Sequence, residues 1–136
     1  MNTLIIFSFF VAAAVAHPAF QLRIPNGQQV PDPCNDGQIW LAVGHYDPDH
    51  HTLQKNPFAL AFRTNGLQWN ATLCQQDSDG DGKTNGEELG DPNCIWTVGA
   101  TPEQAASGHP GLCNPRGSCA DETFYCGCHG NNCIHK

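Results

Sequence analysis

The chain has 136 residues, enough for one domain, and it contains eight Cys, 14 Gly and 10 Pro. It carries 13 Asp and Glu against 6 Lys and Arg, and the resulting net charge of −7 repels phosphate backbones, which excludes a nucleic-acid binder. Large aliphatic residues and Phe are scarce beyond residue 16, so the hydrophobic core is small. We expect such a domain to need covalent cross-links, which the Cys residues can supply as disulfides.

The first 16 residues have the pattern of a signal peptide. Residues 4–16 form an apolar run that is too short to span a bilayer, and Ala14 and Ala16 are the small residues that a signal peptidase needs. We expect cleavage before His17 and secretion into an extracellular, oxidising environment in which disulfides form. No second apolar stretch exists, so we expect no membrane insertion.

The segments between residues 17 and 55 predict little regular structure. Residues 17–33 combine turn signals with several Pro and are expected to be irregular. Residues 38–45 are a short apolar segment whose length fits either a strand or a buried turn. Residues 46–55 are polar, and we expect a surface loop there.

Two short helices are predicted next. Asn56 and Pro57 suit the start of a helix, Phe58 and Phe62 share one apolar face, and the residues at 65 and 66 end it. A second helix is expected over residues 68–76, with Trp69 and Leu73 on one side. Asn70 begins the sequence Asn-Ala-Thr, which predicts a glycosylation site.

Residues 77–88 match the pattern of an EF-hand-like calcium loop. Acidic residues stand at its first, third, fifth and twelfth positions, with Gly82 at the sixth to allow the sharp turn. Ca²⁺ takes six to eight oxygen ligands, and the expected ligand positions are Asp77, Asp79, Asp81, the backbone carbonyl of Lys83, Asn85 and Glu88.

A structural role for this calcium is expected rather than a switch. Thr84 stands where paired loops carry an aliphatic residue, and there is one such loop in the sequence. The residues Gly90, Asp91 and Pro92 end any exit helix after barely a turn, so a helix pair that opens on calcium binding is not expected.

The Cys residues divide the mature chain into a body and a tail. Five of them crowd into the C-terminal part, so at least one disulfide joins tail to body if all eight pair; the connectivity stays open among 105 possibilities. The predicted organisation is a signal peptide at 1–16, a calcium-binding disulfide domain at 17–113 and a Cys-rich tail at 114–136. All eight are predicted disulfide residues: Cys34, Cys74, Cys94, Cys113, Cys119, Cys126, Cys128 and Cys133.

Two other kinds of metal site are less favoured alternatives to the calcium loop and the disulfides. A mature N-terminal His17 and a second imidazole, such as His45 or His109, have the donors of a copper centre in an oxidoreductase. The Cys residues around His129 resemble a zinc site, although disulfides are favoured in a secreted chain. No nucleophile elbow or phosphate-binding Gly loop occurs, so we expect no catalytic activity.

The order and spacing of these motifs resemble those of the temptin family. The similarity includes residues 24–27, 30–34 and 43–45, the long stretch from Phe62 to Trp96 with the acidic loop, and residues 109–111. Temptins are secreted components of the water-borne pheromone mixtures of marine snails. The resemblance implies a secreted signalling protein whose partners are other secreted proteins or a cell-surface receptor, with a calcium loop and a disulfide-stapled body. An extracellular matrix or shell-associated calcium-binding protein is the alternative interpretation.

Overall fold

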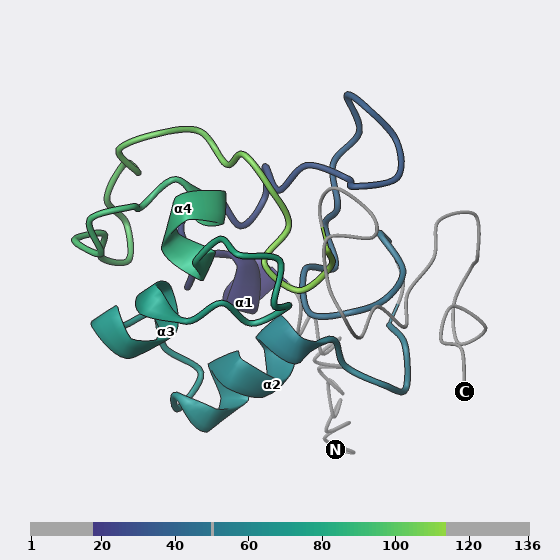
Figure 1. Ribbon diagram of the computed structural model, residues 1–136, viewed down its shortest axis with the longest axis horizontal. Helices are drawn as coiled ribbons and strands as arrows, with labels where there is room; N and C mark the ends of the chain where they lie inside the picture. The colour runs from purple at the N-terminus through teal and green to yellow at the C-terminus, as the bar shows by residue number, and fades with distance from the viewer. Residues whose placement is uncertain (1–17, 50, 114–136) are drawn as a thin grey trace, which may run out of the picture.

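The computed structural model describes residues 18–49 and 51–113, and Figure 1 shows them as loops around four short helices. These helices are α1 (Pro18–Gln21), α2 (Pro57–Thr64), α3 (Ala71–Gln75) and α4 (Asn85–Leu89). One isolated antiparallel bridge joins Pro31 to Ile39, and the described residues contain no longer strand. The prediction of an irregular domain with short helices and little sheet is therefore confirmed.

The predicted signal peptide and the Cys-rich tail lie outside the described residues, as does His17. Within the part that the structure describes, every helix is too short or too polar to cross a lipid bilayer.

Helix α2 forms where its residue pattern predicts. The side chain of Asn56 accepts a hydrogen bond from the backbone N–H of Ala59, and Pro57 occupies the first helical position. Phe58 and Phe62 are buried on the inner face. This helix therefore contributes two of the largest apolar side chains to the core.

Helix α3 is shorter than the predicted helix over residues 68–76. Asn70 has extended backbone angles (φ −141°, ψ 171°), and its side chain accepts a hydrogen bond from the N–H of Leu73. Asn70 is thus the cap and not an interior residue, because its short side chain satisfies a free N–H at the helix start. Leu73 and Cys74 face the core as expected.

The core is one small cluster of seven buried apolar residues. Half-buried Leu67 and Trp69 pack against it, and the Phe58 and Phe62 rings stack with centroids 6.1 Å apart. Burying one such side chain contributes about 1.5–3 kcal/mol, so a cluster of this size needs further contacts, such as disulfides and helix caps, to stabilise the fold. The cluster consists of Ile24, Val30, Val43, Phe58, Phe62, Leu73 and Leu89.

Two segments differ from their predicted character. Residues 18–21 form α1 where irregular structure was expected. Residues 46–55 are more than a surface loop, since Tyr46, Asp47 and Thr52 are buried. The Thr52 N–H donates to Nδ1 of His45, and the Tyr46 N–H donates to the Thr52 hydroxyl, so polar side chains satisfy the backbone of this loop from inside.

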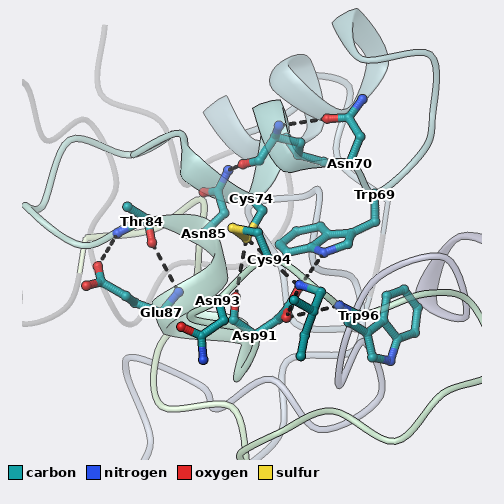
Figure 2. The surroundings of a disulfide bond; sticks show 12 residues. Trp69, Asn70, Cys74, Thr84, Asn85, Glu87, Asp91, Asn93, Cys94 and Trp96 are labelled. Carbon is teal, nitrogen blue, oxygen red and sulfur yellow. Dashed lines mark hydrogen bonds between the residues drawn. A yellow bond between two sulfur atoms is a disulfide. The ribbon is translucent and has the colours of Figure 1, made fainter.

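A disulfide between Cys74 and Cys94 joins α3 to the segment that follows α4 (Figure 2). The two helices pack against each other, and a side chain at Gly86 of α4 would collide with the sulfur of Cys74. Cys34 and Cys113 are disulfide-bonded too. The pairing of all eight Cys stays a prediction.

Candidate metal centre

Three Asp side chains converge in the loop between α3 and α4. Asp77, Asp79 and Asp81 each offer a carboxylate oxygen, and these atoms lie within 4.8 Å of one another. Gly82, at φ 94°, turns the chain so that its N–H donates to Oδ2 of Asp77 at 2.8 Å. A non-Gly residue would adopt this left-handed backbone at a cost.

Glu88 comes to this loop from α4. The residue is 0 % exposed, and neither of its carboxylate oxygens has a hydrogen-bond partner. Gly108 covers it, because a Cβ at that position would lie 2.9 Å from Oε1 of Glu88. The backbone carbonyl of Glu88 accepts the N–H of Ser107 at 2.7 Å, and this hydrogen bond holds the covering segment in place.

Two of the carboxyl groups, those of Glu88 and Asp79, have strongly raised pKa values. Burial, together with the charges of Asp79 and Asp81, raises the pKa of Glu88 to about 10. Burial and the neighbouring Asp81 raise the pKa of Asp79 to about 8. An orphaned, fully buried carboxylate beside three others lacks a positive charge to compensate it.

This donor set fits a hard cation. Carboxylate oxygens on a flexible loop suit Ca²⁺, which takes six to eight oxygens at 2.3–2.6 Å, and the set contains no soft sulfur or imidazole ligand. Asp77, Asp79, Asp81 and Glu88 are therefore the side chains that could hold such an ion. Among the described residues, no other three His, Cys, Asp or Glu side chains come so close together.

The other two predicted ligand positions, Asn85 and Lys83, do not belong to the cluster of carboxylates. Asn85 is fully buried, and its amide donates to the carbonyl of Leu73 at 2.7 Å and to the hydroxyl of Ser78 at 2.8 Å. Its oxygen accepts the N–H of Ser78, so this side chain ties α4 to the end of α3. Lys83 is exposed, and its N–H donates to Oδ1 of Asp81.

Sequence reasoning missed the cap of α4. The Thr84 hydroxyl accepts the N–H of Glu87, and the Glu87 carboxylate accepts the N–H of Thr84, as Figure 2 shows. The four-residue pattern from Thr to Glu before an apolar residue predicts this reciprocal pair. The cap positions the first turn of α4 and therefore Glu88.

Asp91 was also missed as a structural centre. It is fully buried, and it accepts hydrogen bonds from the indole of Trp69 at 2.8 Å and from the N–H groups of Ile95 and Trp96 (Figure 2). An Asp directly before a Pro is a turn signal that could have revealed it.

We expect His17, His45 and His109 not to form a copper centre, and the two that lie among the described residues pack within the body. Nδ1 of His109 accepts the N–H of Gly111, and its ring meets the Trp40 ring edge-on at 5.3 Å. Burial lowers the pKa of His109 to about 3. Nδ1 of His45 accepts the N–H of Thr52. The proposed third ligand, His17, and the Cys residues around His129 lie outside the described residues.

Comparison with known proteins decides the family. The family described as Temptin C-terminal matches residues 14–112. Temptin from Aplysia californica is 47 % identical over 113 residues, which cover 82 % of this chain and 90 % of that protein. The chain belongs to the temptin family. This confirms the resemblance seen in the sequence motifs, and the family match over residues 14–112 includes the whole acidic loop. No solved structure matches the chain.

Proposed function

We propose that this temptin-like protein is a secreted, non-catalytic signalling protein associated with water-borne pheromones, stabilised by one bound calcium ion and by disulfides. Its membership of the temptin family supports the signalling role. Its partners are other secreted proteins or a cell-surface receptor, because a secreted protein without catalytic machinery acts through what it contacts.

The calcium assignment rests on the surroundings of Glu88. Its buried carboxylate has no hydrogen-bond partner, although it lies beside Asp77, Asp79 and Asp81. Burying a carboxylate without compensation costs several kcal/mol, and a divalent cation among these four groups removes that cost. Glu88 stands at the position that closes a calcium loop with both oxygens.

The bound ion serves a structural role in this proposal. Helix α4 ends at Gly90, whose φ of 82° stops it after five residues, and the Cys74–Cys94 bridge holds both helices of the loop. A pair of helices tied in this way has little freedom to open. Calcium thus adds stability by binding the folded state alone, which is worth about 2.7 kcal/mol at a hundredfold excess over the dissociation constant.

Calorimetric titration of the secreted protein with CaCl₂, after extraction with a chelator, tests this site. We expect one calcium per chain and at least about tenfold weaker binding in Glu88→Gln, because the closing ligand loses its charge. Glu87→Gln is the matched control. It removes the same charge from the neighbouring exposed residue, and Gln also completes the cap with Thr84.

Melting curves add a second readout, in which the order of stability of the parent protein and Glu88→Gln should depend on calcium. Without calcium, we expect Glu88→Gln to be at least as stable as the parent protein, because an amide is cheaper to bury than an uncompensated carboxylate. With calcium, the parent protein should melt at the higher temperature. Equal calcium affinity in the parent protein and Glu88→Gln would disprove the assignment.

Secretion and signalling have their own test. Intact mass spectrometry of protein collected from the surrounding water should show a chain that starts at His17. Cross-linking at the native concentration should capture a second secreted protein or a receptor fragment. Protein that stays inside cells, or that leaves its tissue only after extraction with acid or chelator, would contradict the diffusible role.

A further inference from the structure

A cavity of about 650 Å³ opens between α1, α2 and residues 41–45, and it belongs to neither the acidic loop nor the disulfide. Its inner wall is made from the core residues Ile24, Val43, Phe58 and Phe62. Pockets of 300–1,000 Å³ lined by apolar side chains with a few polar groups are typical of small-molecule sites.

Aromatic packing gives this cavity a firm wall. The Phe20 ring of α1 meets the Phe62 ring of α2 edge-on, with centroids 6.1 Å apart, and Phe62 stacks on Phe58. Gly44 approaches α2 so closely that a Cβ there would lie 2.9 Å from the Cβ of Ala59. The residues on both sides of the cavity are therefore held by contacts with one another.

The mouth of the cavity exposes apolar side chains. Phe20, Leu41 and Leu60 line it and are 39 %, 44 % and 54 % exposed. In a chain that has few large apolar residues, three of them around one opening form an apolar entrance that a ligand would cover.

Basic side chains gather at the same opening. Lys55 and Arg63 line the cavity, against a single acidic lining residue, Asp49. The chain as a whole has only 6 Lys and Arg against 13 Asp and Glu, so this local excess of positive charge is the reverse of the overall balance. Lys55 donates to the carbonyl of Thr52, which limits the positions that its ammonium group can take.

We propose that the cavity binds a small amphipathic carboxylate, such as a medium-chain fatty acid. The apolar tail would lie against the Phe rings, where it removes apolar area from water, and the carboxylate would meet Lys55 and Arg63 at the rim. The charge at the mouth favours an anionic head group over a cationic one. This inference is independent of calcium binding at the acidic loop.

Calorimetric titration of the secreted, calcium-loaded protein with decanoate, below the concentration at which decanoate forms micelles, tests the proposal. We expect saturable binding of one decanoate per chain. NMR spectra recorded during the same titration should show chemical-shift changes at residues of α2. Decanol, which has the same tail without the charge, should bind about tenfold more weakly.

Two variants separate the contributions of tail and head group. Leu60→Asp places a negative charge at the apolar mouth and should weaken decanoate binding at least about tenfold. Val98→Asp should not, because Val98 is also an exposed apolar residue but lies outside the cavity. The double variant Lys55→Gln with Arg63→Gln should weaken decanoate binding and leave decanol binding unchanged. Melting curves in calcium verify that each variant is folded.

Three results would overturn the proposal. The first is the absence of saturable decanoate binding to the folded protein. The second is equal binding to the parent protein and Leu60→Asp. The third is self-association of the ligand-free protein that Leu60→Asp abolishes, since the apolar mouth would then be covered by a second copy of the chain.

Discussion

Asn side chains connect segments of this protein that no sheet connects within the described residues. The amide of Asn56 donates to the carbonyls of Val43 and His45, and the amide of Asn26 donates to those of Leu89 and Gln104. Buried carbonyls need hydrogen-bond donors, and in a fold with one isolated bridge few of these come from neighbouring strands. Each amide therefore supplies two hydrogen bonds between segments of the kind that neighbouring strands would otherwise provide.

His109 is another residue whose burial has a measurable consequence. It is fully buried, and its pKa falls from 6.5 to about 3, so the folded protein keeps the ring neutral throughout the mildly acidic range. The unfolded chain binds a proton below pH 6.5 and the folded chain does not. Stability from this residue is therefore complete above pH 6.5 and is lost as the pH falls from there toward 3.

We expect His109 to reduce the free energy of unfolding by about 2 kcal/mol between pH 7 and pH 5, at about 1.4 kcal/mol per pH unit below 6.5. His109→Asn is the comparison, because its amide oxygen can accept the N–H of Gly111 as Nδ1 does. The variant should be less stable at pH 7, since it leaves a gap beside Trp40, and it should lose less stability on acidification.

Urea unfolding at pH 7, 6 and 5 in excess calcium measures this difference. The acidic residues titrate in both proteins and cancel in the comparison, which isolates the imidazole. Parallel losses of stability in the parent protein and His109→Asn would show that the ring accepts a proton in the folded state.

At the scale of elements, caps and tertiary contacts compensate for short helices. Helices of four to eight residues are unstable in isolation, because nucleation costs more than so few hydrogen bonds return. Asn56, Asn70 and Thr84 each cap a helix start with a side-chain oxygen. Three of the four helices thus begin at a specific polar side chain.

The cap of α3 coincides with the predicted glycosylation site. Asn70 is exposed, and its oxygen accepts the N–H of Leu73, so a glycan on the amide nitrogen leaves the cap intact. We expect the secreted protein to carry one glycan at Asn70. Thr72→Ala should remove the glycan without changing the cap, because Thr72 is exposed and lies within the helix.

Asn70→Asp and Asn70→Ala separate the two roles. Both lose the glycan, but Asp keeps the capping oxygen, whereas Ala should cost about 1 kcal/mol of stability. Intact mass before and after glycosidase treatment, together with melting curves, gives both readouts. A parent protein whose mass does not change on glycosidase treatment would rule out the glycan.

The sequence predicted helix boundaries well at residues whose type favours a helix start or a helix end. Asn56 with Pro57 placed the start of α2, and Gly90 placed the end of α4. The burial of Tyr46 and Asp47 depends on long-range packing, so no local pattern indicates it. The convergence of Asp77, Asp79 and Asp81 follows from their spacing, whereas the cover over Glu88 comes from Gly108, twenty residues further along.

At the scale of the whole molecule, the segment after residue 100 packs over the acidic loop and α4. The Gln104 N–H donates to the carbonyl of Gly90, and the Ser107 N–H donates to that of Glu88. Further along, the sulfur of Cys113 lies 3.8 Å from the carbonyl of Asp79. The candidate metal centre thus combines the loop, α4 and a distant segment that excludes water from Glu88.

The Cys74–Cys94 disulfide encloses the acidic loop and α4 within a sequence separation of 20 residues. Closing a loop of this length in the unfolded chain is worth about 3 kcal/mol in the chain-entropy account. The same bridge holds α3 to the segment that follows α4. If calcium binds as we propose, the bridge brings the carboxylates of the loop together before the ion arrives.

We expect Cys74→Ala combined with Cys94→Ala to lower the free energy of unfolding by about 3 kcal/mol and to weaken calcium binding several-fold. Ala suits position 74 because the Cys74 side chain is fully buried beside Gly86. Denaturant unfolding and calcium titration measure the two effects, and alkylation without reductant verifies that the remaining Cys stay paired. Calcium affinity equal to that of the parent protein would mean that the acidic loop is organised without the bridge, by the cap at Thr84 and the cover at Gly108 alone.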